Sequence, residues 1–202
     1  MQEKNKPRSN TSRTDATRSA LIDAATRLFA GKGYADTSTP EVVSAAGVTR
    51  GALYHHFADK TDLFRAVVTE EYARVAAEIT AAARNRPGSA LDALRQGSRA
   101  YLNAMNNRGR VRIMLLDGPA VLGRAELDRI DHQTSAGALR TGLAAAMQAG
   151  QIRALPLAAL TTQLSALFDS AALAVSEGGT PQDHLDVLDA VLAGLTVPPD
   201  SP

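Results

Sequence analysis

The sequence predicts an all-α protein. Of the 202 residues, 45% are hydrophobic but only 4% are aromatic, and Trp is absent. The apolar content therefore lies mainly in Ala and Leu, which favour helices, rather than in the β-branched and aromatic residues that favour strands. Apolar residues also recur at helical spacing along most of the chain, and Gly, Pro and capping residues divide it into segments of helical length. About nine helices are expected.

The N-terminal part is expected to form a short arm followed by a first helix. Residues 1–12 are polar and predict a flexible arm without the apolar core of a secretory signal. From about residue 14, apolar residues recur at helical spacing until Gly31 and Gly33 provide a stop. The apolar positions of this helix are Leu21, Ile22, Ala25, Leu28 and Phe29.

Residues 38–62 predict two short helices joined by a tight turn. Ser38, followed by an early Pro40 and by Glu41 three positions later, has the pattern of a capping box for the first of these helices. Gly47 ends that helix, because glycine permits a change of direction in which a Cβ atom would clash. Thr49 is a suitable N-cap for the second helix, expected over residues 50–57.

The second short helix has one face that must be buried and one that is free. Leu53 and Phe57 are four residues apart and are expected to face inward. Small and polar side chains are therefore left at the outside and at the N-terminal end of the helix, where insertion into a DNA groove requires them. They are Thr49, Arg50, Gly51, Tyr54 and His55.

The rest of the chain is predicted to form further helices. Residues 59–62 repeat a capping pattern, and a long helix is expected from about Lys60 to Arg84, before Pro87 and Gly88 break it. The later helices are expected over residues 89–107, 108–116, 121–149, 157–176 and 181–195. The very apolar stretch 154–175 also contains Pro, Thr, Gln and Asp, and it predicts a buried helix rather than a membrane span.

Charge and cysteine content narrow the functional classes. The net charge is only +1, but residues 1–60 contain nine Lys or Arg against six Asp or Glu, whereas no Lys or Arg follows Arg153. This distribution suits a chain that approaches phosphates with its N-terminal part only. The absence of Cys excludes disulfides, thiolate nucleophiles and Cys-ligated metal sites, and it is compatible with the cytoplasm, where we expect the protein to lie.

The segment GVTRGALYHHF, followed by ADKTDL, resembles the DNA-binding signature of the TetR family of bacterial transcriptional regulators. The resemblance implies a three-helix helix-turn-helix domain over residues 13–60 and a larger helical effector-binding and dimerisation domain over residues 61–202. It implies a sequence-specific regulator, usually a repressor, that binds double-stranded operator DNA.

The same resemblance assigns roles within the N-terminal domain. Thr39 would hold a phosphate at the start of its helix. Thr49, Arg50 and Gly51 would enter the major groove, with Arg50 suited to a bidentate contact with guanine, although a contact to phosphate alone is also open. Further phosphate contacts would come from Tyr54, His55 and Lys60, and minor-groove contacts from the arm residues Arg8 and Arg13.

In the C-terminal domain the resemblance implies a pocket for a small-molecule effector and a two-fold dimer. Candidate pocket residues are Tyr101, Met105, Met114, His132 and Met147, although such residues are more often plain core. The helices expected over residues 157–195 carry more apolar side chains than one core needs, which favours a homodimer on a palindromic operator. Effector binding would release the protein from that operator.

Two other functional classes are weighed against this interpretation. A DNA-binding architectural protein of the same fold would need no effector and no internal cavity. An enzyme is disfavoured, because no catalytic motif is found and the pairs at 131–132 and 183–184, each an Asp beside a His, lack further partners in sequence. No metal or cofactor is expected. His55 and His56 beside Asp59 could belong to a metal site, but adjacent residues on a helix point about 100° apart and no further ligand lies at a useful spacing.

Overall fold

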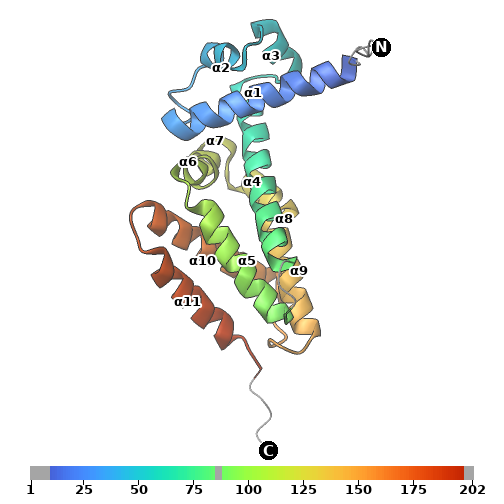
Figure 1. The fold of residues 1–202 in the computed structure, drawn as a ribbon, viewed down its shortest axis with the longest axis vertical. Helices are drawn as coiled ribbons and strands as arrows, with labels where there is room; N and C mark the ends of the chain where they lie inside the picture. Colours follow the sequence, from blue (N-terminus) through green and yellow to red (C-terminus); the bar gives the residue numbers. More distant parts are fainter. Residues whose placement is uncertain (1–9, 85–87, 198–202) are drawn as a thin grey trace, which may run out of the picture. The chain divides into compact units, whose positions relative to one another are not determined.

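The computed structural model describes residues 10–84 and 88–197 of the chain. Their regular structure consists of helices, apart from an isolated antiparallel bridge between Ile152 and Thr196 (Figure 1). The expected all-α class is therefore confirmed. The chain forms two compact units, Met1–Val68 and Thr69–Pro202, which divide inside helix α4, whereas the sequence placed a functional boundary at residue 60, where α4 begins.

The first unit contains three helices and the beginning of a fourth. They are α1 (Asn10–Lys32), α2 (Thr39–Ala46), α3 (Arg50–His56) and α4 (Lys60–Arg84). Helix α1 begins earlier than the expected start near residue 14, so Arg13 lies in a helix. Arg8, the other residue of the expected arm, lies outside the described residues.

An aromatic cluster organises the core of the first unit. The rings of Phe29 and Phe64 meet edge to face with centroids 5.1 Å apart, and Tyr34 lies 4.9 Å from Phe64. Such aromatic pairs stabilise a core beyond the area that they bury. The hydrophobic residues buried around them include Leu21, Ile22, Ala25, Val42, Leu53, Phe57, Leu63 and Val67. The core thus joins α1 to the helices that follow it.

The turn between α2 and α3 forms as its sequence predicts. The Ser38 hydroxyl accepts the Glu41 N–H, and the Glu41 carboxylate accepts the Ser38 N–H, which completes the capping box. Hydrogen bonds from Lys32 and from Ser38 lower the pKa of Glu41 to about 2, so this cap stays charged at neutral pH. At the other end of α2, Gly47 adopts a φ of 65° in the left-handed region.

The substitution Gly47→Ala is expected to lower the free energy of unfolding by about 1–2 kcal/mol, because a residue with a Cβ disfavours the left-handed conformation. No atom lies within 4 Å of the position of that Cβ, so the effect comes from the backbone and not from a clash. Urea denaturation of the full chain measures it.

Gly51→Ala is the matched control for this turn. Gly51 lies inside α3, and its added Cβ would be 3.9 Å from Thr49 Oγ1, an ordinary contact. Alanine favours helices over glycine by up to about 1 kcal/mol, so this variant is expected to gain stability. Equal stability changes in the two variants would contradict the role given to the left-handed backbone at Gly47.

The second unit consists of helices that follow the division inside α4. They are α5 (Ala90–Met105), α6 (Arg108–Val111), the π-helical segment η1 (Arg112–Asp117), α7 (Gly118–Leu122), α8 (Arg124–Gln133), α9 (Ser135–Gln148), α10 (Leu157–Ser176) and α11 (Pro181–Gly194). Helix α5 packs against α9, α10 and α11, and α10 also packs against α9 and α11 (Figure 1). The bounds of α4, α10 and α11 agree with the sequence expectation to within one residue.

The prediction of a single helix over residues 121–149 was wrong, because the structure divides this segment into α8 and α9. The Thr134 hydroxyl donates to the Ile130 carbonyl at 2.8 Å, and Asp131 Oδ1 accepts the Ala136 N–H at 3.0 Å. The chain passes so closely here that a Cβ at Gly137 would lie 2.8 Å from the His132 carbonyl oxygen. The break depends on these contacts, and no Pro marks it in the sequence.

The prediction that a helix ends at residues 117–119 was also wrong. The chain stays helical from Arg108 to Leu122, with a π-helical segment in the middle. Pro119 lies in the first turn of α7, directly after the π-helical segment, and the helical run continues through it. A Cβ at Gly118 would approach the Ile113 carbonyl oxygen to 2.9 Å, so this glycine permits a close backbone approach inside the helical run instead of ending it.

Helix α10 is long and apolar enough to cross a membrane by length and composition alone. Within the described residues it is the one helix that meets this criterion, which core helices of soluble proteins also meet. Its side chains Leu164, Phe168 and Ala172 are buried against neighbouring helices, and 33% of its most apolar stretch is buried within the chain. Much of this apolar helix therefore lies outside the chain's own core.

Candidate functional site

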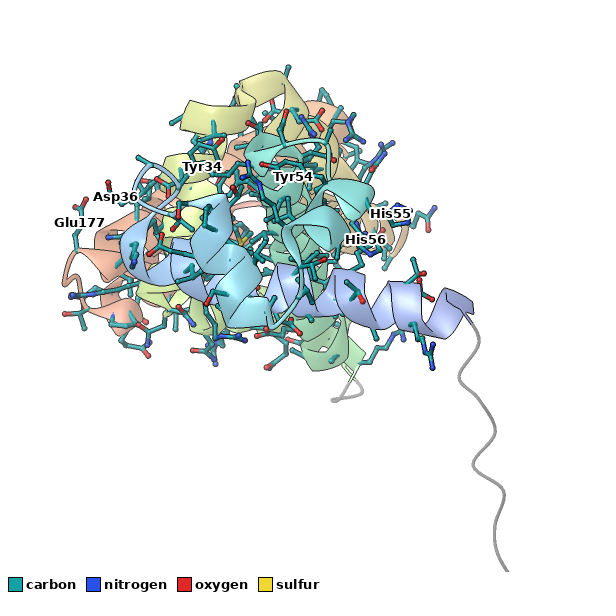
Figure 2. All side chains as sticks on the ribbon, turned by 90° about the horizontal axis from the view of Figure 1, so that it is seen from above. Tyr34, Asp36, Tyr54, His55, His56 and Glu177 are labelled. Carbon is teal, nitrogen blue, oxygen red and sulfur yellow. The ribbon has the colours of Figure 1, made fainter. Side chains whose placement is uncertain are left out.

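Helix α3 presents one buried and one exposed face, as its sequence predicts. Leu53 is fully buried and Phe57 nearly so. The five residues expected on the outside are all exposed, and the rings of Tyr54 and His55 extend from α3 in Figure 2. They are Thr49, Arg50, Gly51, Tyr54 and His55. Thr49 also caps the helix, because its hydroxyl accepts the Ala52 N–H at 3.2 Å.

Three of the predicted DNA-contact residues meet at one point of this surface. Hydrogen bonding with Thr39, and then with Arg50, lowers the pKa of the Tyr54 hydroxyl. The Arg50 guanidinium carbon lies 5.6 Å from the centre of the Tyr54 ring. The contacts link the start of α2 to α3. A cation, a phenol and the Thr39 hydroxyl are therefore close together, which are groups that can donate hydrogen bonds to a phosphate.

Lys60 differs from the exposed residues, because its ammonium group is already engaged inside the first unit. It donates to the carbonyl oxygens of Tyr34 at 2.9 Å and of Thr37 at 3.0 Å. Its nitrogen also lies 4.1 Å from the centre of the Tyr34 ring. An ammonium has three N–H donors, so at most one is left for a phosphate. Lys60 mainly holds the loop that leads into α2.

The two adjacent histidines have different surroundings. His55 is exposed, whereas His56 is half-buried, and its pKa is lowered by burial and then by the charges of His55 and Arg18. Arg18 comes from α1, with its guanidinium carbon 5.4 Å from the centre of the Phe57 ring. Sequence reasoning missed Arg18, because only folding brings α1 beside the end of α3. Over the described residues no group of three metal-ligating side chains is found.

The second unit contains a cavity of about 430 Å³. Residues of α4, α5, α8, α9 and α10 line it, and most of the wall is apolar or small. Among the predicted ligand residues, Tyr101 lines the cavity. The other four do not: Met105 and Met114 are fully buried core residues, His132 is exposed and Met147 is half-buried.

Two carboxyl groups that sequence reasoning missed lie in the cavity wall. Asp169 of α10 accepts the Tyr101 hydroxyl at 2.6 Å, and burial raises the pKa of Asp169. Asp131 of α8 accepts the Ala136 N–H, yet burial raises the pKa of Asp131 to about 6. In the sequence Asp131 stood out only as the neighbour of His132, but the break before α9 carries Asp131 into the wall.

Comparison with known proteins gives two family matches. Residues 21–67 match a family described as "Bacterial regulatory proteins, tetR family". Residues 91–195 match "Tetracyclin repressor-like, C-terminal domain". The first match covers the helices around the α3 surface, and the second covers most of the unit that contains the cavity.

Individual proteins agree with these matches. The chain is 30% identical over 176 residues to the transcriptional repressor AcnR of Corynebacterium glutamicum, covering 86% of this chain and 89% of AcnR. It is 56% identical over 48 residues to the transcriptional regulator AcrR of Shigella flexneri, which is 24% of this chain and 22% of AcrR. A TetR-family regulator from Pectobacterium atrosepticum has a similar crystal structure, with a TM-score of 0.75, 30% identity and coverage of 95% of this chain and 100% of that one.

Proposed function

Since the chain belongs to the TetR family and is a DNA-binding transcriptional regulator, we propose that it represses transcription as a homodimer on a palindromic operator and that a small molecule releases it. The observation that carries the proposal is the exposed surface of α3, where Arg50 and Tyr54 meet Thr39 of α2. A short helix with small and polar residues at its start fits the major groove.

Within this surface, each residue has a proposed contact. Arg50 reads a guanine with its two-pronged guanidinium group, and Thr49 and Gly51 permit close approach to the base edges. Tyr54 and His55 bind backbone phosphates, as does Thr39 at the start of α2. Lys60 contributes mainly by fixing the loop before α2, since two of its donors are already used.

The proposed dimer forms through α10 and α11. The sequence predicted an apolar surplus in this region, but Leu164, Phe168, Leu188 and Leu192 are buried in the chain's own core. What supports the dimer is the remaining exposed apolar surface, with Val187 56% exposed and Val191 37% exposed on α11. A two-fold pairing would bury such a surface against its own copy.

The cavity of the second unit supports effector binding over an architectural role. A protein that only shapes DNA has no need for an internal cavity, whereas small-molecule sites commonly have volumes of about 300–1,000 Å³. The cavity of about 430 Å³ lies in this range. We place the effector there and the protein in the cytoplasm, where its DNA is.

Selection of bound fragments from genomic DNA with the purified protein is expected to enrich a palindromic sequence at about 0.15 M salt. The two half-sites should lie about one helical turn, roughly 34 Å, apart, because a two-fold dimer presents two copies of α3. Sequencing of the enriched fragments measures both properties. The protein with Arg50, Tyr54 and His55 replaced by Ala is the control.

Each result of this selection has a clear meaning. Enrichment of a single half-site without symmetry would contradict the dimer but keep the regulator. No enrichment above the triple variant would contradict specific binding through α3, and with it the proposed function.

A further inference from the structure

The two carboxyl groups of the cavity have no cationic partner in the wall. Over the described residues, neither Asp131 nor Asp169 takes part in an ion pair, and their hydrogen bonds come from the Ala136 N–H and the Tyr101 hydroxyl. Among the described residues of the wall, the one basic side chain is Arg84, which is exposed at the end of α4. Carboxylates in an apolar wall are costly unless a cation compensates them. The wall of this cavity does not supply that cation.

Basic groups outside the wall do not replace it. The charge of Arg124 lowers the pKa of Asp169, and that of His132 lowers the pKa of Asp131, but in both aspartates burial outweighs these charges and the net shift is upward. Arg124 is 70% exposed and its Nε lies 2.9 Å from Asp128 Oδ1, so its guanidinium is engaged at the surface. A cation inside the cavity would be the first direct partner of the two carboxylates.

Tyr72 of α4 adds a third polar group to the cavity wall. Its side chain lines the cavity and is only 6% exposed, yet its hydroxyl forms no hydrogen bond within residues 10–84 and 88–197. The hydroxyl is open to the cavity, so its donor and its acceptor capacity are both available to a bound group. Burial raises the pKa of Tyr72, and the charges of Asp131 and Asp169 raise it further, so the phenol lies near both carboxylates and bonds to neither. A ligand group placed there would complete its hydrogen bonding.

The rest of the wall selects an apolar ligand body. Leu94 from α5, Leu139 from α9 and Phe168 from α10 contribute large hydrophobic side chains, and several Ala and Gly residues leave room between them. A ligand that fits must therefore combine a hydrocarbon body with one group that donates hydrogen bonds and carries positive charge.

We propose that this cavity binds an organic ammonium ion, a protonated amine on an apolar body, whose N–H groups are held by Asp131 and Asp169 and whose body contacts Leu94, Leu139 and Phe168. The inference names the chemical class of the effector and rests on the proposed function. An anionic ligand would be repelled by the two carboxylates, and a neutral ligand would leave their charge uncompensated. The raised pKa of Asp131, about 6, is consistent with a buried carboxylate that lacks a cationic partner.

Three compounds with one apolar body and different head groups test the proposal: phenylbutylamine, phenylbutanol and phenylbutyrate. Isothermal titration of each into the full-length protein at pH 8 compares an ammonium, a hydroxyl and a carboxylate. The amine is expected to bind at least about tenfold more tightly than the alcohol, the factor typical of hydrogen bonds to charged groups. The carboxylate is expected to bind more weakly than the alcohol.

Single charge-removing variants locate the effect. Asp131→Asn and Asp169→Asn are each expected to weaken amine binding by about tenfold or more while they leave the alcohol affinity within about twofold. Glu177→Gln is the control, because it removes the same charge from an exposed position between α10 and α11. Amine binding should be unchanged in this control.

Misfolding is separated from loss of the site by thermal unfolding at pH 8. The folded-state pKa of Asp131 lies above its ordinary value, so ionisation of this group favours the unfolded state, and the destabilisation is complete above about pH 6. In the Asp131→Asn variant, the amide oxygen of the new side chain would still accept the Ala136 N–H. This variant is therefore expected to unfold at a higher temperature than the parent at pH 8, although it loses amine binding.

Several outcomes would overturn the proposal. They are equal affinity for the three head groups, amine binding that survives both substitutions, and no binding of any of the compounds. Operator binding is measured in parallel with the selected fragment. If the fragment is bound but the amine is not, the ammonium inference fails and the regulator remains. If the amine binds through both carboxylates but does not weaken operator binding, the ammonium site remains and effector release fails.

Discussion

Arg50→Ala is expected to abolish the sequence preference of operator binding while most of the nonspecific affinity remains. Arg50 is the first residue of α3, it is exposed, and its guanidinium lies beside the Tyr54 ring. A bidentate contact to guanine is worth about 1–3 kcal/mol of discrimination. The two half-sites bound by a dimer would double this free energy of discrimination. The affinity of Arg50→Ala for the operator should therefore fall by roughly 30-fold to more than 10,000-fold.

Fluorescence anisotropy with the selected operator and a scrambled duplex at about 0.15 M salt measures this difference. Arg140→Ala is the matched control, because it removes the same charge from an exposed position on α9 in the second unit. This control should bind both duplexes like the parent protein. A uniform loss on both duplexes in Arg50→Ala, with a shallower salt dependence, would instead make Arg50 a phosphate contact.

Arg110→Ala is expected to lower the free energy of unfolding by about 2–3 kcal/mol, because a buried carboxylate loses one of its two arginine partners. The Arg110 Nε donates to Glu71 Oε2 at 2.8 Å, and the side chains are only 15% and 5% exposed. Arg110 Nη1 also donates to the Ala104 carbonyl at 2.9 Å and to Glu78 at 3.1 Å. Arg74 remains beside Glu71 but is itself 39% exposed.

Urea denaturation of the full chain measures the effect, with Arg129→Ala as the control. Arg129 also makes two hydrogen bonds to a carboxylate, that of Glu126, but its side chain is 55% exposed. Exposed ion pairs contribute about 0–1 kcal/mol to the free energy of unfolding, so the stability of this variant should differ little from that of the parent. A loss of less than about 1 kcal/mol in Arg110→Ala would show that the buried network does not hold the second unit together.

Local features of the fold were predictable from the sequence because neighbouring residues cause them. The capping box at Ser38, the left-handed Gly47 and the cap at Thr49 involve residues no more than four positions apart. The exposed face of α3 follows equally from the spacing of Leu53 and Phe57. These short-range interactions determined the helix-turn-helix segment and the candidate DNA contacts, whose roles remain predictions until operator binding is measured.

Features that depend on packing between distant residues were not predictable. The helix break at Thr134 depends on the close approach of Gly137 to the His132 carbonyl group, and no helix-breaking residue in the sequence predicts it. Lys60 was expected to face a phosphate, but the carbonyl groups of the loop between α1 and α2 engage it.

The all-α class, the helix-turn-helix and the exposed surface of α3 follow from the amino-acid pattern, because helical period and capping act within one or two turns. The cavity follows from folding alone. Packing placed Met105 and Met114 in the core, and it brought Asp131, Asp169 and Tyr72 from three different helices into one wall. A cavity is the space left where helices distant in sequence pack together, and no periodicity within a single helix specifies that space.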